Sequence, residues 1–286
     1  MAMLSDAASP AATVDASAPG AVAETPYYIE LRNVTLVYGE GDGQILAIEN
    51  LQLQLRRGDF IAVVGPSGCG KSTLTKLVTG LLPPTAGTII VDGKRVQVPI
   101  KDVGMAFQNA TLMPWRTTLG NVMLPLEVVE PHKSRLRHAR AEYVARAEAL
   151  LRSVGLQGFA AKHTWELSGG MQQRASLCRA LIHEPHLLML DEPFAALDAF
   201  TREELWSIMQ DLWLQRRFTT ILVTHDLREA VYLADTVHVM SNRPGRFVLR
   251  RDVDLPRPRT LGTTFDPRFI DIVHELRDKI GEVKAA

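Results

Sequence analysis

The sequence predicts an α/β fold whose core is a parallel sheet, with a smaller antiparallel sheet beside it. Residues 60–64, 187–190 and 221–223 are apolar runs without alternation, which is typical of parallel strands covered on both faces. Residues 51–55 instead alternate leucine with glutamine, the pattern of a strand with one exposed face. Segments with helical periodicity lie between the apolar runs, as an α/β architecture requires.

The N-terminal part begins with a tail and continues into the antiparallel sheet. Residues 1–26 are rich in Ala, Ser and Pro, and we expect a disordered tail because so few bulky apolar side chains cannot order a segment. Asp6 and Asp15 stand where an export signal would have a basic end and an apolar core, so no export signal is expected. A first strand is expected at residues 29–36.

Helices are expected in the middle and at the end of the chain. Prolines mark loops through the middle, at Pro83, Pro84, Pro114, Pro125 and Pro131. The helical pattern of residues 131–154 predicts a separate small lobe. An amphipathic pattern ends the chain, with Asp266 as the expected N-cap and Pro267 as the first helical residue.

The composition argues against several classes of protein. The 286 residues contain 32 Lys and Arg against 32 Asp and Glu, so the formal net charge is zero and offers no general attraction to nucleic acid. No run of about 18 apolar residues is present, so we expect no membrane-spanning helix. Two cysteines, Cys69 and Cys178, cannot build a framework of several disulfides, which favours a reducing compartment.

Residues 65–72 carry the strongest local motif. They match G-x-x-x-x-G-K-[ST], directly after the apolar run 60–64 and before an expected helix. In this setting backbone N–H groups surround phosphates, Lys71 reaches the β- and γ-phosphate oxygens, and the Ser72 hydroxyl ligates Mg²⁺. The alternative is a chance glycine-rich turn, which the flanking strand and helix disfavour. The sequence therefore predicts a nucleoside triphosphate site made by Gly65, Pro66, Ser67, Gly68, Cys69, Gly70, Lys71, Ser72 and Thr73.

Two acidic residues, Asp191 and Glu192, follow the apolar run 187–190. Ligands of open α/β sheets lie at the carboxyl ends of the strands, so both carboxylates are expected beside the phosphate loop. Asp191 is the expected partner of Mg²⁺, and Glu192 is the expected general base for a water in line with the γ-phosphate. The alternative is a pair of acidic residues that only caps a loop before Pro193.

Residues 167–174, Leu-Ser-Gly-Gly-Met-Gln-Gln-Arg, resemble the signature of the ATP-binding subunits of ABC transporters. The resemblance covers about residues 27–250, and the family's motifs occur in order at Tyr38, the phosphate loop, Gln108, the signature, Asp191-Glu192, Leu197-Asp198 and His225. It implies a P-loop NTPase of the ABC ATPase type at residues 27–255, with an antiparallel β subdomain, a parallel-sheet core and a small helical subdomain at about residues 109–170. A C-terminal extension would follow at 256–286. Three departures, at Cys69, Met171 and Ala195-Ala196, remove no catalytic group.

The resemblance implies roles for individual side chains. Tyr38 would stack on adenine, and Gln108 would contact Mg²⁺ or the attacking water. His225 would hold the γ-phosphate and position Glu192. The alternatives are a Tyr38 that only packs, a solvated Gln108 and a structural His225, and the ordered spacing disfavours the last two. Cys69, at a helix N-terminus, is a candidate reactive thiol, although a small filler residue is the favoured interpretation.

The signature also implies a second copy of the chain as partner. Ser168, Gly169 and Gly170 open an expected helix, whose N-terminal end is suited to anions. In the family arrangement two copies pack head to tail, and the signature of one covers the ATP held by the other. Asp198 is counted among the nucleotide-binding residues by the same resemblance. Hydrolysis of ATP would then open the pair.

Three segments resemble the ATPases of nitrate, sulfonate and taurine importers, at residues 108–122, 243–246 and 254–259. The resemblance implies an importer ATPase on the cytoplasmic face of a bacterial inner membrane, with separate permease subunits and, indirectly, an extracytoplasmic solute-binding protein. An importer for another small solute and a non-transport ABC ATPase are the alternatives, although the latter would need a coiled-coil insertion or a second cassette. A GTPase, a small-molecule kinase and a binding subunit without turnover fit the motifs less well.

Two surface features allow more than one interpretation. The apolar residues 112–115 are expected either to dock a membrane subunit or to be buried under the helical lobe. The arginines between residues 243 and 259 are interrupted by Asp252 and Asp254, so a solvated hairpin is expected there rather than a site for lipid or nucleic acid.

Overall fold

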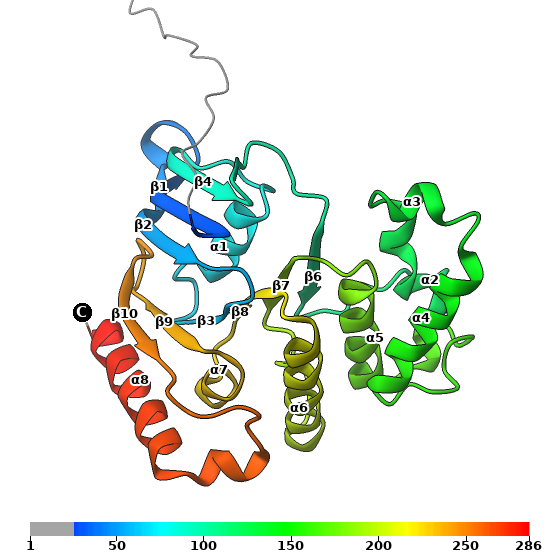
Figure 1. The fold of residues 1–286 in the computed structure, drawn as a ribbon. Coiled ribbons are helices and arrows are strands. Elements are labelled where there is room, and N and C mark those ends of the chain that lie inside the picture. Colours follow the sequence, from blue (N-terminus) through cyan, green and yellow to red (C-terminus); the bar gives the residue numbers. More distant parts are fainter. Residues whose placement is uncertain (1–25, 286) are drawn as a thin grey trace, which may run out of the picture.

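The computed structural model describes residues 26–285, so the predicted tail lies outside the described residues except for Pro26. These residues form two sheets and the helices around them (Figure 1). The core sheet has six strands in the order β10-β9-β3-β8-β7-β6. Their bounds are β3 Phe60–Val64, β6 Val103–Phe107, β7 Leu187–Asp191, β8 Thr219–Val223, β9 Thr236–Met240 and β10 Phe247–Asp252.

The three apolar runs of the sequence form the centre of the core sheet. β3 pairs in parallel with β8, and β8 with β7, and nearly all of their side chains are buried. β9 and β6 extend the parallel arrangement on either side, and β10 closes one edge in the antiparallel direction. The prediction of a parallel core is therefore confirmed.

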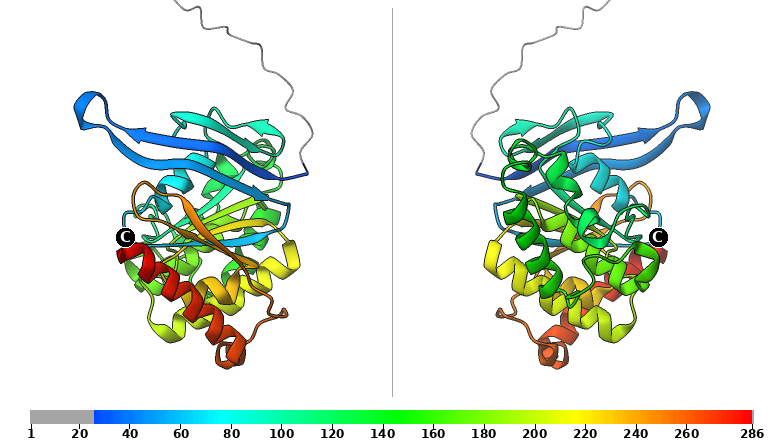
Figure 2. Two further views of the ribbon diagram at one scale, coloured as in Figure 1. Left: turned by 90° about the vertical axis from the view of Figure 1, so that its left-hand side faces the viewer. Right: turned by 90° about the vertical axis from the view of Figure 1, so that its right-hand side faces the viewer.

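Helices cover one face of the core sheet, as Figure 2 shows. They are α5 Gly169–Leu181, α6 Ala199–Arg216, α7 Leu227–Leu233 and α8 Pro267–Ala285. Their apolar side chains share a cluster with Phe60, Ala62 and Val64 of β3. The rings of Trp213 and Phe60 pack edge to face, with 5.8 Å between their centroids. Burial of these side chains supplies the main driving force that holds the helices against the sheet.

The opposite face packs against α1 Lys71–Val78 and the antiparallel sheet. That sheet has the order β2-β1-β4-β5, with bounds β1 Ile29–Tyr38, β2 Ile45–Leu55, β4 Ala86–Val91 and β5 Lys94–Arg95. Leu51, Leu53 and Leu55 are buried while the intervening glutamines are exposed, as the alternation predicts. A one-turn 3-10 helix, Gly41–Gly43, joins β1 to β2. β1 runs on to Tyr38, past its expected end at residue 36.

A small helical lobe stands beside the core sheet (Figure 1). It contains α2 Thr118–Val122, α3 His132–Arg135 and α4 Arg140–Ser153, with 3-10 turns at Leu124–Glu127 and Thr164–Glu166. Its apolar cluster combines Tyr143 and Leu150 of α4 with Ala175 and Cys178 of α5. Because α5 also packs on β6, it connects the lobe to the sheet and extends the lobe's core past residue 170. The domain limits themselves stay predictions.

The C-terminal extension packs onto the core. After a 3-10 turn at Leu261–Phe265, α8 begins at Pro267 as predicted. Asp266 Oδ1 accepts a hydrogen bond from Arg268 N at 2.9 Å, as a capping side chain does. The apolar face of α8, including Phe269 and Leu276, is buried in the same cluster as the helices of the core.

The arginines between residues 243 and 259 do not form one solvated hairpin. The prediction is wrong for Arg257, whose side chain is 11% exposed and pairs with Asp235, and for Arg259. β9 and β10 do pair as a hairpin, with Arg250 exposed, but Arg259 is only 2% exposed. Its guanidinium donates to the carbonyl oxygens of Val231, Tyr232 and Ala234 at 2.9, 3.1 and 2.7 Å. These carbonyls lie at the C-terminal end of α7, where a helix has no donors of its own to offer.

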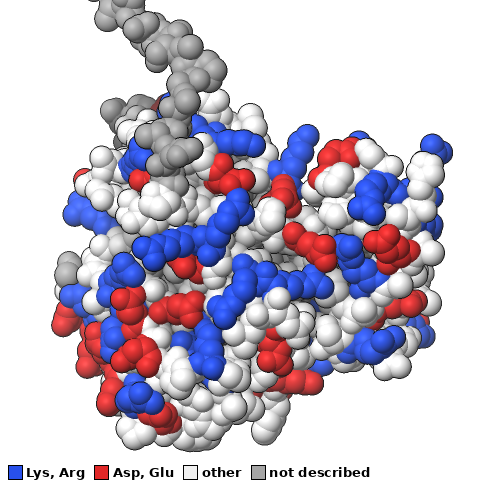
Figure 3. Space-filling model, in the orientation of Figure 1, with Lys and Arg blue, Asp and Glu red and all other residues white. Residues whose placement is uncertain are grey.

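Charges of both signs are distributed over the surface. On the face in Figure 3, basic and acidic side chains are interspersed over the core and the helical lobe. Ion pairs such as Arg146–Glu184 at 3.2 Å and Arg174–Glu204 at 3.1 Å join side chains that are distant in the sequence. Within residues 26–285, no helix has both the length and the apolar character needed to cross a bilayer.

Candidate nucleotide site

The phosphate loop, residues 65–72, turns at the carboxyl end of β3 and leads into α1. Gly68 and Gly70 have φ values of +75° and +108°, a backbone region that favours glycine. A Cβ at Gly70 would also lie 3.3 Å from the carbonyl oxygen of Ala47. α1 begins at Lys71, so Lys71 and Ser72 of the motif already belong to the helix. The amides of this first turn have no acceptor within the helix and are available to a ligand.

Lys71 lies within the loop with 7% of its surface exposed. Its Nζ donates to the carbonyl oxygens of Gly65 and Pro66 at 2.9 and 2.7 Å. A buried ammonium requires such partners, because desolvation without hydrogen bonds is unfavourable. The ammonium is therefore held inside the loop by oxygen atoms, which phosphate oxygens can replace.

Asp191 and Ser72, the predicted Mg²⁺ ligands on β7 and α1, are adjacent. Ser72 Oγ donates to Asp191 Oδ1 at 3.3 Å. The pKa of Asp191 is raised, mainly by burial. The hydrogen bond from Ser72 opposes this increase, and the charge of nearby Glu192 adds to it. A carboxylate beside a hydroxyl fits Mg²⁺, which binds few protein oxygens together with substrate phosphates and waters.

Glu192 has a left-handed backbone conformation, with φ of +51°. Its amide donates to the carbonyl oxygen of Val223 at 2.8 Å, and such conformations at non-glycine residues cluster at functional sites. Glu192 Oε2 lies 3.3 Å from Nδ1 of His225, which follows β8. The structure therefore brings together the two side chains that the motifs predict as base and partner, and their catalytic roles stay predictions.

A pocket of about 250 Å³ opens over the phosphate loop, and we call it the loop pocket. Its lining residues are Tyr38, Ala47, Ser67, Gly68, Gly70, Lys71, Ser72, Thr73, Glu192 and Arg243. Tyr38 is 37% exposed, and its hydroxyl lies 3.2 Å from Thr73 Oγ1. An exposed ring at the first turn of α1 is available for stacking, which favours the predicted role over simple packing.

Two lining residues, Ala47 and Arg243, are missed by the sequence analysis. Arg243 extends from the turn between β9 and β10, and its Nη2 donates to the carbonyl oxygen of Gly68 at 3.2 Å. The only local signal is the segment 243–246, which indicates a transporter group and does not indicate contact with the phosphate loop. Ala47 carries no sequence signal.

The signature residues lie outside the loop pocket of their own chain. Ser168 caps α5 with its hydroxyl, and Gly169 and Gly170 are the first residues of that helix, as predicted. Asp198 caps α6 in the same way. A Cβ at Gly170 would lie 3.5 Å from a methyl group of Leu197, so the signature and the Asp198 loop are neighbours of each other.

Gln108 is also outside the loop pocket, at the exposed end of β6. It follows Phe107, whose register partner on β7 is Asp191. The side chain is therefore anchored one position beyond the strand end that carries the predicted Mg²⁺ ligand.

Cys69 is buried, with 1% of its surface exposed. Burial raises the pKa of its thiol, and the nearby Lys71 ammonium only partly opposes this effect. Reactive cysteines are accessible and have a lowered pKa. The reactive interpretation of Cys69 is therefore wrong, and a small buried residue is the correct description.

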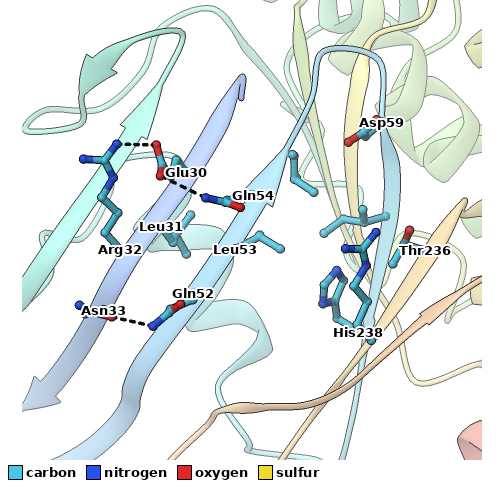
Figure 4. Close-up of a pocket in the computed structure, with 13 residues that line it drawn as sticks. Glu30, Leu31, Arg32, Asn33, Gln52, Leu53, Gln54, Asp59, Thr236 and His238 are labelled. Carbon is cyan, nitrogen blue, oxygen red and sulfur yellow. Dashed lines mark hydrogen bonds and ion pairs between the residues drawn. The ribbon is translucent and has the colours of Figure 1, made fainter. Parts of the chain in front are cut away.

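A larger cavity, of about 540 Å³, lies between the antiparallel sheet and strands β3, β9 and β10 (Figure 4). Glu30 accepts hydrogen bonds there from Arg32 at 2.8 Å and from Gln54 at 3.3 Å, so these polar groups pair with each other. Burial, with a smaller effect of Arg250, lowers the pKa of His238 to about 4. Among the described residues, the lining includes neither the phosphate loop nor the carboxylates after β7, so this cavity is not the nucleotide site.

Comparison with known proteins agrees with these motifs. The family model described as ABC transporter matches residues 48–195. The aliphatic sulfonates import ATP-binding protein SsuB of Bacillus anthracis is 40% identical over 81% of this chain and 89% of its own length. The taurine import ATP-binding protein TauB of Burkholderia pseudomallei (strain 1710b) is 40% identical over 84% of this chain and 92% of its own length.

Solved structures give the same result. The dimeric structure of MJ0796, a bacterial ABC transporter cassette, matches with a TM-score of 0.68 and 30% identity, over 80% of this chain and 100% of its own. The chain therefore belongs to the ABC transporter family and carries the family's ATPase domain.

Proposed function

We propose that the chain is the ATP-hydrolysing subunit of an importer that takes up a small anion, such as an alkanesulfonate, taurine or nitrate, through separate membrane subunits. The observation that carries the cargo class is the 40% identity to relatives named for the import of aliphatic sulfonates and of taurine. In this proposal the chain works at the cytoplasmic face of the membrane. An extracytoplasmic binding protein and the permease select the cargo.

ATP occupies the loop pocket in this proposal. The amides at the start of α1 and of the loop donate to the phosphates. Lys71 Nζ exchanges the carbonyl oxygens of Gly65 and Pro66, at 2.9 and 2.7 Å, for phosphate oxygens. The exchange is favourable because a phosphate oxygen carries negative charge and a carbonyl oxygen does not, so the ammonium gains a Coulomb attraction in addition to the hydrogen bond. Tyr38 stacks on the adenine.

The Ser72 hydroxyl and the Asp191 carboxylate, whose oxygens lie 3.3 Å apart, would hold Mg²⁺. Gln108 approaches from the end of the neighbouring strand β6, as the motif order implies. When bound, the ion neutralises charge on the β- and γ-phosphates. The site offers the ion only a few protein oxygens, which suits Mg²⁺ because it prefers waters and substrate phosphates as its remaining ligands.

Hydrolysis needs a base beside the γ-phosphate. Glu192 lines the loop pocket, and it takes a proton from the attacking water as general base. His225 lies 3.3 Å from the same carboxylate, which supports its role in positioning Glu192. Its contact with the γ-phosphate is carried over from the resemblance to the family. Glu192 has a left-handed backbone directly after β7, the kind of strained position that clusters at functional sites.

A second copy of the chain completes the site. The N-terminus of α5, with Ser168, Gly169 and Gly170, lies outside the loop pocket of its own chain. A helix N-terminus is suited to phosphate, and Asp198 lies in the loop beside it. We therefore place these residues over the ATP of a partner copy, as the dimeric state of the 30% identical cassette supports. ATP then joins the two copies, and its hydrolysis releases them.

The segment after Gln108 is the proposed contact with the permease. Trp115 is 71% exposed, whereas Leu112 packs partly against the core of the helical lobe. The two alternatives for residues 112–115 therefore apply to different side chains. Trp115→Ala should keep the ATPase activity of the isolated chain but reduce co-purification with the permease. Undiminished co-purification would remove Trp115 from this contact.

Uptake measurements test the cargo class. A strain that lacks this chain should fail to take up labelled taurine, alkanesulfonate or nitrate, and the wild-type chain should restore uptake of one of them. Lys71→Ala is the matched control that should not restore it, and growth on sulfate or ammonium shows that the cells are otherwise intact. Normal uptake of all three anions in the deletion strain would exclude this cargo class.

A further inference from the structure

We propose that Arg243 is a nucleotide-binding residue, whose guanidinium binds the phosphates of the nucleotide in the loop pocket. This inference rests on the proposed nucleotide site. It assigns a function to the turn between β9 and β10, residues 241–246, which the motif roles leave without one. The ligand group is a phosphate oxygen of a nucleoside triphosphate.

The position of Arg243 is the first support. The residue lines the loop pocket together with Ser67, Lys71 and Glu192, and its Nη2 donates to the carbonyl oxygen of Gly68 at 3.2 Å. Gly68 lies in the middle of the phosphate loop. A guanidinium that contacts the loop backbone from the side of the pocket is within reach of an anion that the loop encloses.

The charge of Arg243 is the second support. Among the described residues that line the loop pocket, Lys71 and Arg243 are the two with cationic side chains. In the described part of the chain, Arg243 forms no ion pair, and its one hydrogen bond is the bond to Gly68. A guanidinium has five N–H donors, so most of them remain available. Arginine is suited to phosphate because its planar donors match two oxygens at once.

The turn is attached to β2 and lies close to the phosphate loop, so the Arg243 side chain starts from a defined place. Gly245 N donates to the carbonyl oxygen of Ala47 at 2.9 Å, and Glu49 N donates to that of Gly245 at 3.2 Å. Arg246 forms an ion pair with Glu49. A Cβ at Gly245 would lie 2.3 Å from the carbonyl oxygen of Cys69. Only glycine allows this close approach of the turn to the loop.

The turn is also closed on itself and attached to α8. Ser241 Oγ donates to the carbonyl oxygen of Pro244 and accepts from Arg246 N, both at 2.8 Å. Asn242 Nδ2 donates to the carbonyl oxygen of Val283 at 2.6 Å, in the last turn of α8. The backbone on both sides of Arg243 is therefore held, which limits the entropy lost when its side chain binds an anion.

Equilibrium binding to the full chain tests the proposal. Arg243→Gln should weaken binding of Mg²⁺ and a non-hydrolysable ATP analogue by about tenfold, the effect of losing one charge-assisted contact. Adenosine binding should change by less than about twofold, because adenosine has no phosphate. Arg243→Lys should retain part of the affinity. Arg250→Gln is the matched control, since Arg250 lies on the same hairpin, bonds to Asp252 at 3.1 Å and lies outside the loop pocket.

Unchanged affinity of Arg243→Gln for the analogue would overturn the assignment, as would equal weakening of adenosine and analogue. Lys71→Ala, measured alongside, separates this failure from failure of the nucleotide site itself. Loss of binding in Lys71→Ala with no change in Arg243→Gln would overturn the inference alone. Full binding by both variants would overturn the proposed site together with the inference.

Discussion

Replacement of Arg259 by methionine tests the most unexpected contact of the fold. Arg259 is 2% exposed and donates to the carbonyl oxygens of Val231, Tyr232 and Ala234 at the end of α7. Methionine fills a similar volume but donates no hydrogen bond. The variant Arg259→Met should therefore leave these carbonyls unpaired in an interior that water does not reach.

The size of the effect follows from two opposing contributions. The two N–H groups of Nη1 are shared among these three oxygens, and Nη2 donates to the carbonyl oxygens of Val253 and Leu255 at 3.3 Å. Four N–H donors of a charged group at about 1.5 kcal/mol each, the lower end of the usual range because two of the bonds are long, contribute about 6 kcal/mol. Burial, with a smaller effect of Arg257, lowers the pKa of Arg259 from 12.5 to about 10, which corresponds to about 3 kcal/mol against the charge. The difference leaves a loss of about 3 kcal/mol on replacement, or roughly 10 °C in Tm for a domain of this size.

Equilibrium urea denaturation, followed by tryptophan fluorescence, measures this loss as a shift of the unfolding midpoint. Arg250→Met is the control, since Arg250 is exposed on β10 and pairs with Asp252 on the same strand, so its loss should stay below about 0.5 kcal/mol. Arg259→Lys keeps a charge but not the planar set of donors, and should fall between the two. An Arg259→Met chain within about 1 kcal/mol of the wild type would refute the role of these bonds.

Four further outcomes follow from the site and the core. Lys71→Ala should abolish ATP binding, as titration with a fluorescent ATP analogue would show, and retained affinity would contradict the loop site. Glu192→Gln should bind ATP and stay dimeric but release phosphate about 10²–10⁴-fold more slowly, whereas a wild-type rate would exclude the carboxylate as base. Cys69 and Cys178, both 1% exposed and with pKa values raised by burial, should react with Ellman's reagent only after denaturation, so rapid labelling of the native chain would contradict their burial. His238, whose pKa is lowered to about 4, stays neutral in the fold while the unfolded chain binds a proton below about pH 6.5. The free energy of unfolding should therefore fall by up to about 3 kcal/mol as the pH is lowered from 6.5 to 4. If the urea midpoint of His238→Asn depended on pH in the same way as that of the wild type, this prediction would be contradicted.

The elements that the sequence predicts well are those set by local patterns. The phosphate loop and its place between a buried strand and a helix are predicted because the apolar run, the spaced glycines and the helix start follow one another directly in the chain. The apolar runs predict the parallel core for the same reason, since burial on both faces leaves no alternation. Asp191 and Glu192 are found because strand ends in such sheets meet at one edge.

The features that the sequence does not predict depend on contacts between distant segments. Arg259 resembles a solvated arginine because its carbonyl partners, at residues 231–234, meet it only after α7 and the C-terminal extension have packed together. Arg243 reaches Gly68 for a comparable reason, since the turn after β9 meets the phosphate loop only in the assembled sheet. No pattern within either segment shows these partners.

The place of β3 in the core sheet affects how the chain matures during synthesis. This strand leaves the ribosome early, yet its neighbours β8 and β9 are residues 219–223 and 236–240. Long-range pairing of this kind is slow and leaves apolar segments uncovered until the partners arrive. A nascent chain that stops before residue 219 therefore carries a complete phosphate-loop motif on a strand with neither neighbour, and it should depend on chaperones rather than on nucleotide for its solubility.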